Sequence, residues 1–240
     1  MTSALGILDC FYAESLGCAP EVLRRGGVGL IEGDLTTIWY AKGSPLVLYA
    51  LATGSGAVVC VQPEFRTIVD EVMAEEVARG SGTLDVAACL ALEQALTPLV
   101  DVDFWFSGVR LYCESKSFVD RSSGHAREIT PDEDERAHEL HRRWGGKVFG
   151  EMVEGRFVSW AVVKPLSELV WDLSIETLIA HRGQGHAASA VSAALKHVFT
   201  NGRLAGWGCD RTSVASIRTA RSVGFEYYGF DFGCVGRIRC

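Results

Sequence analysis

The stretch with the clearest chemical content is Arg182-Gly183-Gln184-Gly185-His186-Ala187. Two glycines in a short loop let backbone N–H groups approach a bound anion without an intervening side chain. The stretch separates an expected strand from an expected helix, and a helix N-terminus adds unsatisfied N–H donors and a partial positive charge. Arg182 adds a full charge beside them. The pattern therefore predicts a binding site for a diphosphate group.

Two other interpretations of this stretch stay open from the residues alone. Gly183, Gly185 and Ala188 satisfy the glycine pattern of a dinucleotide-binding fold, and Asp210 lies near the spacing of its ribose-binding acid. However, only 30 residues follow Asp210, which is too few for the remaining strands and helices of such a sheet. A dinucleotide fingerprint also usually opens its domain. The other alternative is a glycine-rich turn that holds no ligand.

Other polar groups are better explained without a ligand. Asp101 and Asp103 are typical of a solvated turn, and His138 and His141 share a helix without a third metal ligand. None of the eight cysteines forms a Cys-x-x-Cys pair, so we expect no metal site and the free thiols of a reducing compartment.

The elements around the glycine loop are expected to alternate between strands and helices. The predicted strands cover 126–130, 147–154, 156–164, 169–179, 204–209 and 225–234, and the predicted helices begin at Thr130 and cover 183–199 and 213–223. Thr130, followed by Pro131 and Glu133, has the pattern of an N-cap with a capping box. The tight turn at Glu154-Gly155 indicates that the strands before the glycine loop form an antiparallel meander.

The first half of the chain predicts a further α/β region. Its expected helices cover 5–16, 63–78 and 84–96, and its expected strands cover 28–32, 35–40, 47–51, 57–61 and 104–113. The apolar stretch 45–61 is interrupted at 53–56, which predicts two buried strands around a turn and no membrane span. A serine-rich polar stretch over 115–125 predicts a boundary between a domain 1–120 and a domain 126–240.

The second domain resembles the GNAT superfamily of N-acetyltransferases, whose signature is R/Q-x-x-G-x-G/A. Arg182, Gly185 and Ala187 fall on the signature positions. The stretch 127–131 is similar to the opening strand and capped helix of these proteins, and 220–225 is similar to the helix and Gly-Phe turn near their end. The fold that this resemblance implies is α/β (α+β), with a central mixed, mostly antiparallel sheet flanked by helices.

Three further segments look closest to a bacterial branch of GNAT proteins. They are Ile175-Glu176-Thr177, Trp207-Gly208-Cys209-Asp210 and Ser216. Members of that branch carry an additional N-terminal α/β region, which would account for residues 1 to 120 without assigning them a role.

The resemblance also implies which residues bind acyl-coenzyme A. In GNAT proteins the backbone of the strand before the signature hydrogen-bonds the pantetheine arm, and backbone groups of the signature hold the diphosphate. The implied set here is Ile175, Glu176, Thr177 and Leu178, then Arg182, Gly183, Gln184, Gly185, His186, Ala187 and Ala188, and finally Ser213 and Ser216 in the helix that flanks the pantetheine. The His186 side chain is expected to face solvent near the phosphates.

The sequence departs from the GNAT pattern where protons must move. The residues at the positions of the usual base, the usual acid and a frequent helix-opening Asn are Trp171, Ala220 and Ser213. Glu176 is the replacement base that we predict, because a carboxyl buried mid-strand among apolar residues is readily tuned for proton transfer. Asp172, beside Trp171, is a second candidate, and Tyr228 is the candidate for a replacement hydroxyl.

These observations predict an N-acetyltransferase that moves an acetyl group from its co-substrate acetyl-CoA to the amine of a small molecule or peptide. Two alternatives are a non-catalytic acyl-CoA-binding or sensing protein, and an NAD(P)-binding domain. The formal net charge of −7 disfavours a nucleic-acid partner. The absence of a signal-like N-terminus favours a cytoplasmic protein without membrane association, and a homodimer is compatible with the sequence.

Overall fold

The computed structural model describes residues 3–33, 35, 45–79 and 84–239. The strand predicted over 35–40 lies outside the described residues except for Leu35. The chain divides into two compact units. Unit 1 comprises Met1–Val109 and Tyr228–Cys240, and unit 2 comprises Arg110–Tyr227.

Unit 1 contains most of the predicted N-terminal elements. They are α1 (Ala4–Leu16), the 3-10 turn η1 (Pro20–Arg24), β1 (Val28–Glu32), β2 (Leu46–Thr53), β3 (Ala57–Val61), η4 (Pro63–Phe65), α2 (Arg66–Ala78), α3 (Val86–Leu96) and η5 (Thr97–Leu99). Two strands belong to both units: β4 (Val100–Cys113) starts in unit 1, and β10 (Glu226–Ile238) ends in it.

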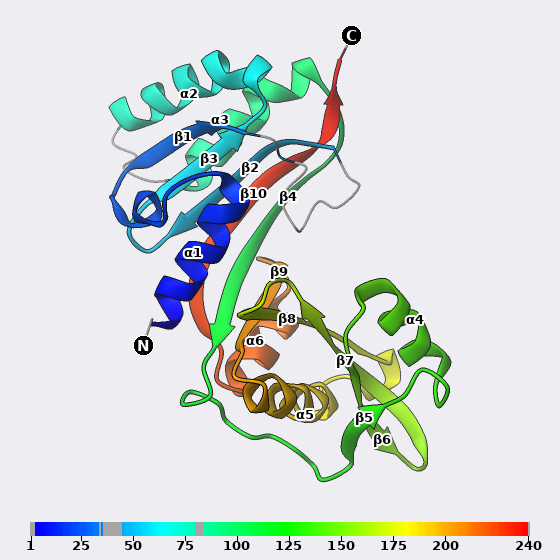
Figure 1. Ribbon diagram of the computed structural model, residues 1–240. Helices are drawn as coiled ribbons and strands as arrows, with labels where there is room; N and C mark the ends of the chain where they lie inside the picture. The colour runs from blue at the N-terminus through cyan, green and yellow to red at the C-terminus, as the bar shows by residue number, and fades with distance from the viewer. Residues whose placement is uncertain (1–2, 34, 36–44, 80–83, 240) are drawn as a thin grey trace. The chain divides into compact units, whose positions relative to one another are not determined.

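The core of unit 1 forms around two strands that are buried on both faces. Strands β2 and β3 pair antiparallel, with Leu48 opposite Val61 and Ala52 opposite Ala57, as the interrupted apolar stretch predicts. Helices α2 and α3 pack along these strands through apolar residues that include Met73 (Figure 1). This packing stabilises both helices, since burying an apolar side chain contributes about 1.5–3 kcal/mol.

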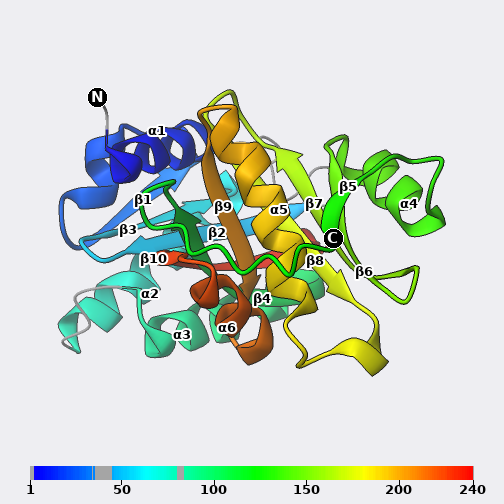
Figure 2. The ribbon, with the colours of Figure 1, turned by 90° about the horizontal axis from the view of Figure 1, so that it is seen from below.

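Unit 2 contains the elements predicted around the glycine loop. They are β5 (Ala126–Ile129), α4 (Glu135–Trp144), β6 (Val148–Val153), β7 (Arg156–Pro165), β8 (Val170–Thr177), η6 (Ile179–His181), α5 (His186–Thr200), β9 (Leu204–Asp210) and α6 (Val214–Ser222). Helices α5 and α6 share one apolar cluster on one face of the strands (Figure 2). Helix α4 packs in a different cluster with Trp160 and Val162 of β7.

Hydrogen bonding links the strands in the order β1-β3-β2-β10-β4-β9-β8-β7-β6-β5. Pairing is parallel for β1–β3 and β8–β9, and it is antiparallel for β2–β3, β2–β10, β5–β6, β6–β7 and β7–β8. The predicted mixed, mostly antiparallel α/β sheet flanked by helices is therefore confirmed. The antiparallel strands β6, β7 and β8 before the glycine loop disagree with a dinucleotide-binding fold, whose strands are parallel.

The start of α4 differs from the prediction. Asp134, and not Thr130, is the N-cap, and its carboxylate accepts a hydrogen bond from the backbone N–H of Ala137 at 2.8 Å. Glu133 instead accepts hydrogen bonds from the backbone and hydroxyl of Thr130, at 2.8 and 3.0 Å. Half of the predicted capping box thus forms one turn ahead of the helix.

The limits of the two units differ from the domain limits expected at 115–125. This stretch lies within unit 2, where the backbone N–H groups of Arg121 and Ser123 donate to the hydroxyls of Ser192 and Ser189 on α5, both at 2.9 Å. The last strand, β10, pairs with β2 in unit 1. The assignment of 1–120 and 126–240 as domains stays a prediction.

Among the described residues, no helix has both the length and the apolar character needed to span a membrane.

Candidate functional site

The pairing between strands β8 and β9 ends shortly before the glycine loop. Their parallel pairing runs from Val170 opposite Leu204 to Leu173 opposite Trp207. Both strands then continue, β8 to Thr177 and β9 to Asp210. The last four residues of β8 consequently have an edge that the β8–β9 ladder leaves open.

The far side of this β8 segment is held firmly by β7. The buried hydroxyl of Ser159 donates to the Glu176 carbonyl at 3.0 Å and shares a hydrogen bond with the Thr177 hydroxyl at 2.8 Å. The backbone N–H of Leu178 donates to the Val158 carbonyl at 2.9 Å. The open edge is therefore a fixed surface, and an extended ligand can add to it through backbone hydrogen bonds.

The glycine loop has the conformation that its sequence predicts. Gly183 and Gly185 have φ values of +76° and +89°, which residues with a Cβ rarely adopt. Gly185 is the N-cap of α5, and the N–H of Ser189 is bonded back to its carbonyl at 3.1 Å. The N–H groups of the three residues before Ser189 belong to the first turn of the helix, where an anion is favoured.

Two side chains fold the loop back onto the end of β8. Arg182 donates through Nε to the carbonyl of Thr177 at 3.2 Å, and Gln184 donates to the carbonyl of Ala180 at 3.1 Å. These bonds place the predicted loop residues beside the open edge of β8. The structure thus brings together the predicted pantetheine and diphosphate residues.

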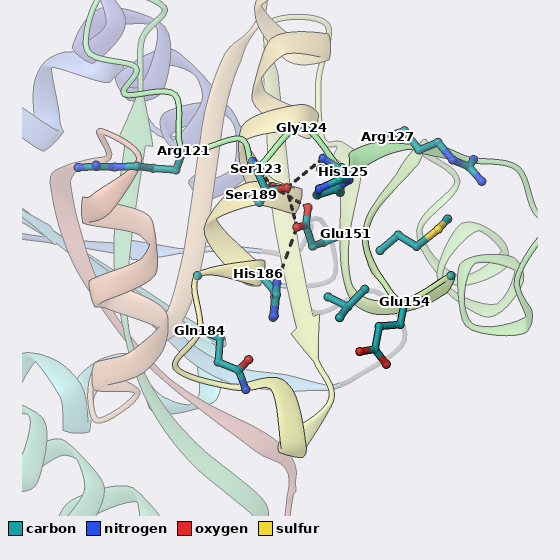
Figure 3. Close-up of a pocket in the computed structure, with 15 residues that line it drawn as sticks. Arg121, Ser123, Gly124, His125, Arg127, Glu151, Glu154, Gln184, His186 and Ser189 are labelled. Carbon is teal, nitrogen blue, oxygen red and sulfur yellow. Dashed lines mark hydrogen bonds and ion pairs between the residues drawn. The ribbon is translucent and has the colours of Figure 1, made fainter.

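A cavity of about 830 Å³ lies beside the same loop in unit 2. Gln184, Gly185, His186 and Ser189 line one part of it, and residues of 121–127 and 151–155 line the rest (Figure 3). The Glu151 carboxylate, with a 2% exposed side chain, accepts hydrogen bonds from Ser123 at 2.6 Å and from Ser189 at 2.7 Å.

The position of His186 differs from the expectation that it faces solvent. Its side chain is 17% exposed, and Nδ1 lies 3.7 Å from Oε1 of Glu151. The ring of His181, on the other side of the loop, has its centroid 5.9 Å from that of His186. Two imidazoles therefore bracket the predicted diphosphate loop.

Glu176 does not have the burial on which its prediction as a base rested. Its side chain is 45% exposed and forms an ion pair with Arg136 of α4. Arg136 donates through Nε to the Glu176 carboxylate at 2.8 Å and also pairs with Glu139. The side chain lies above an apolar strand but points into a charged cluster, because successive strand residues face opposite sides.

Asp172 is buried, but a second buried charge already engages it. Its carboxylate lies 2.5 Å from Nζ of Lys164, and the two side chains are 5% and 11% exposed. The Lys164 ammonium also lies over the ring of Trp144, 4.8 Å from its centroid. This arrangement is typical of a structural ion pair, since each charge compensates the desolvation of the other.

Tyr228, the predicted replacement hydroxyl, belongs to unit 1. It stacks on Tyr12 and donates to the Asp9 carboxylate at 2.9 Å. Burial, followed by the nearby charge of Asp9, raises the pKa of Tyr228 well above its usual value. A phenol with a raised pKa is a weaker acid, so these contacts do not support a role in protonating a thiolate.

The two predicted serines lie at the start of α6. The Ser216 hydroxyl accepts a hydrogen bond at 3.1 Å from the indole N–H of Trp207, which belongs to the last β8–β9 pair. Ser213 is the residue before the helix, and its backbone N–H donates to the Asp210 carbonyl at 3.0 Å. Ser216 therefore fixes the indole at the point where the strands separate.

Sequence reasoning missed two charged residues of this region. The sequence predicts Glu151 only as part of the strand 147–154 and Arg136 only as part of the helix that begins at Thr130. The one sequence signal for Glu151 is a carboxylate within the otherwise apolar stretch 148–153. Within the described residues, no three His, Cys, Asp or Glu side chains are grouped as they would be around a metal ion.

Solved structures with a similar arrangement show which fold this is. A GCN5-related N-acetyltransferase from Kribbella flavida aligns over 98% of this chain and 96% of its own, with a TM-score of 0.50 and 16% identity. A GNAT-family protein from Novosphingobium aromaticivorans aligns over 59% of this chain and 69% of its own, with a TM-score of 0.50 and 15% identity. The chain has the GNAT fold. No family model and no curated protein matches its sequence.

The alignment with the Kribbella structure covers nearly the whole chain and so includes residues of both units. Within this fold, β8 is the strand that precedes the signature loop, and α5 is the helix that the loop opens. The resemblance and the geometry therefore select the same strand edge and the same loop.

Proposed function

We propose that this protein is an N-acetyltransferase that transfers the acetyl group of acetyl-CoA to an amine. The observation that carries the proposal is the separation of β8 from β9 after Leu173 and Trp207, directly before a glycine loop that opens α5. An extended, amide-bearing ligand with a diphosphate at one end matches both features.

The two parts of acetyl-CoA would bind through different groups. The amides of the pantetheine arm would pair with the open edge of β8, as an added strand pairs with a sheet edge. The diphosphate would accept hydrogen bonds from the backbone of the glycine loop and the first turn of α5. Because the diphosphate would be held by backbone N–H groups, the site requires glycines that expose the backbone more than it requires particular side chains.

The reaction would be attack of the neutral amine on the thioester carbonyl carbon. A C–N bond forms, the C–S bond breaks, the amine nitrogen loses a proton and the CoA sulfur gains one. Backbone N–H groups near the parted strands would stabilise the oxyanion. Glu176 stays the candidate for orienting the acceptor ammonium and accepting its proton, since it is an accessible carboxylate on β8.

A second function is favoured by the contacts of the predicted proton-moving residues. Arg136 engages Glu176, Lys164 engages Asp172, and Asp9 engages Tyr228. A non-catalytic acyl-CoA sensor needs the open edge of β8 and the glycine loop but no group that moves protons. Turnover with an amine distinguishes the enzyme from the sensor.

Thermal unfolding with acetyl-CoA and with NAD tests which ligand binds at the open edge of β8 and the glycine loop. A ligand at one hundred times its Kd stabilises the native state by about 2.7 kcal/mol, so a clear rise in Tm is expected with acetyl-CoA. An equal or larger rise with NAD, or none with acetyl-CoA, would contradict the proposal. Release of free CoA thiol across a panel of amines then tests catalysis, and binding without thiol release would favour the sensor.

A further inference from the structure

The cavity beside the glycine loop holds a carboxylate that the proposed reaction does not use. Glu151 is 2% exposed, and a buried carboxylate is costly unless hydrogen-bond donors or a cation compensate it. The hydroxyls of Ser123 and Ser189 donate to different oxygens of this carboxylate. They fix its orientation, and they leave His186 facing Oε1 across 3.7 Å.

This arrangement decides which ring nitrogen of His186 is presented to the loop. Nδ1 faces Glu151, and Figure 3 shows the rest of the ring extending away from the carboxylate towards the side where Gln184 lies. His186 is also the first residue of α5, so its backbone adjoins the N–H groups that would hold the diphosphate. Nε2 is the ring nitrogen on the edge that extends away from Glu151 (Figure 3).

The chemistry of imidazole then restricts the state that binds a phosphate. In the neutral ring, a proton on Nδ1 facing Glu151 leaves Nε2 as an acceptor with its lone pair outward. A diphosphate oxygen is also an acceptor, so this neutral ring would repel it. Only the doubly protonated ring presents one N–H towards Glu151 and a second N–H towards a diphosphate oxygen at the same time.

We propose that His186 binds the diphosphate of acyl-CoA as an imidazolium, with Glu151 as its positioning residue, so that cofactor binding takes up a proton. This inference rests on the proposed function, because it assigns a side chain to the same diphosphate site. The proton moves from solvent to Nε2, and no covalent bond of the cofactor changes.

Other charged and titratable groups also face this ring. Glu151 on β6 lies 3.7 Å from Nδ1, Glu154 lines the same cavity, and the ring of His181 on η6 lies 5.9 Å from that of His186 between centroids. His125 and Arg121 line the cavity from the segment before β5. An arriving diphosphate adds negative charge beside the ring and therefore shifts its protonation towards the imidazolium.

Calorimetry with dephospho-CoA tests the proposal on the full chain. This probe keeps the diphosphate but lacks the 3′-phosphate monoester, a class of group that itself titrates at about pH 6. Titrations at about pH 7, where histidine changes charge, would be repeated in buffers with different ionisation enthalpies to count the protons taken up. We expect the wild-type protein to take up a measurable fraction of one proton.

Two histidine variants separate the proposed role from a general loss of charge. His186→Gln keeps an amide donor but no titrating ring, and we expect it to lose the proton uptake and bind roughly threefold to tenfold more weakly. His138→Gln, at an exposed position on α4, should behave as the wild type. Glu151→Gln should reduce the uptake if its unfolding curve shows a native fold, but the His186→Gln result decides alone.

The outcomes distinguish this inference from the proposed function. Proton uptake that persists in His186→Gln, or none in a wild-type protein that binds dephospho-CoA, would overturn the role of His186 and leave the cofactor site intact. No binding of either CoA or dephospho-CoA to the wild-type protein would overturn the proposed function itself.

Discussion

Gly224 occupies a place in unit 2 that leaves no room for a side chain. Its φ is +100°, and a Cβ built there would lie 2.1 Å from the carbonyl oxygen of Ser117. The next residue, Phe225, is buried and meets the indole of Trp207 edge-on at 5.3 Å between ring centroids. The Gly-Phe turn thus fixes an aromatic side chain behind the strand that borders the candidate site.

Replacing this glycine should destabilise the protein more than its backbone conformation alone would. We expect Gly224→Ala to lower the free energy of unfolding by about 3 kcal/mol or more, from strain and a clash with backbone. Gly202→Ala is the matched control, because Gly202 also has positive φ (+67°) but its Cβ would meet nothing within 4 Å. It should cost about 1 kcal/mol. Equal losses in urea unfolding would show that the clash is relieved.

Substitution of Asp172 tests whether its ion pair with Lys164 stabilises the fold. Asp172→Asn leaves the Lys164 ammonium buried without its counter-charge, so we expect a loss of about 3 kcal/mol in unfolding free energy. Removing both charges, in Asp172→Asn with Lys164→Met, should restore part of that stability. A single variant as stable as the wild type would show that the ion pair does not support the fold.

The sequence predicts residues of the site where local conformation is decisive. Gly183 and Gly185 are recognisable because a positive φ in a short loop nearly prescribes glycine. Glu151 is not, because its hydrogen-bond partners Ser123 and Ser189 lie 28 and 38 positions away. The predicted burial of Glu176 is wrong for a related reason. Its apolar neighbours in sequence do not reveal its ion-pair partner Arg136, which is 40 positions away.

At the scale of elements, the start of α4 depends on one carboxylate with two partners. Oδ1 of Asp134 accepts hydrogen bonds from the backbone N–H of Ala137 and from the indole N–H of Trp160, both at 2.8 Å. The sequence pattern predicts Thr130 as the cap, whereas the structure uses Asp134, four residues later. The hydrogen bond from the buried Trp160, which needs an acceptor, favours Asp134.

Two substitutions at this cap should separate hydrogen bonding from charge. Asp134→Ala removes the cap and leaves a buried indole N–H without its acceptor, so we expect a loss of about 2–4 kcal/mol. Asp134→Asn keeps an acceptor oxygen for both donors and should retain most of the stability. Chemical unfolding of the two variants measures the difference, and similar losses in both would assign the effect to the charge.

The segment before β5 is attached to α5 by an ion pair that responds to acid. Asp120 lies 2.7 Å from Lys196, and its hydrogen bonds with Lys196 and then Ser122 lower its pKa to about 2. Because the pKa in the folded state is below the ordinary carboxyl pKa of 3.8, this carboxylate stabilises the fold above that pH. The contribution is lost as the pH falls through about 2.

Asp120→Asn should therefore change the acid limb of the stability profile. We expect its unfolding free energy to fall less steeply than that of the wild type between pH values of about 4 and about 2. Urea unfolding at several pH values measures both slopes, with Asp132→Asn, at another exposed carboxyl of unit 2, as control. Parallel profiles for Asp120→Asn and wild type would show that the ion pair is absent in solution.

At the scale of the whole molecule, unit 1 is assembled from residues far apart in the chain. Strand β10 pairs with β2 from Gly229 opposite Thr53 to Val235 opposite Leu46, and Tyr49 donates to Asp231 across 182 positions. No local pattern predicts such a pairing. This is why the last strand could be recognised from the sequence but not assigned to its unit.

Two fragments of the chain should show what happens when β10 is separated from β2. A fragment 110–240 keeps Phe232, Cys234 and Val235, which are buried in the full chain, but lacks the β2 strand that pairs with them. We expect it to associate through this unpaired apolar edge, whereas fragment 110–227 should stay monodisperse. Size-exclusion chromatography with light scattering compares the two. A monomeric 110–240 fragment would contradict the expectation.

The place of β10 also sets an order of events during synthesis. Domains generally fold in the order in which the ribosome releases them, N-terminal first. Here all of unit 2, Arg110–Tyr227, emerges before Tyr228–Cys240 supplies the strand that β2 needs. The nascent chain therefore contains the apolar strands β2 and β3 without their β10 partner while unit 2 emerges and folds. The half of the protein that is translated first is completed last.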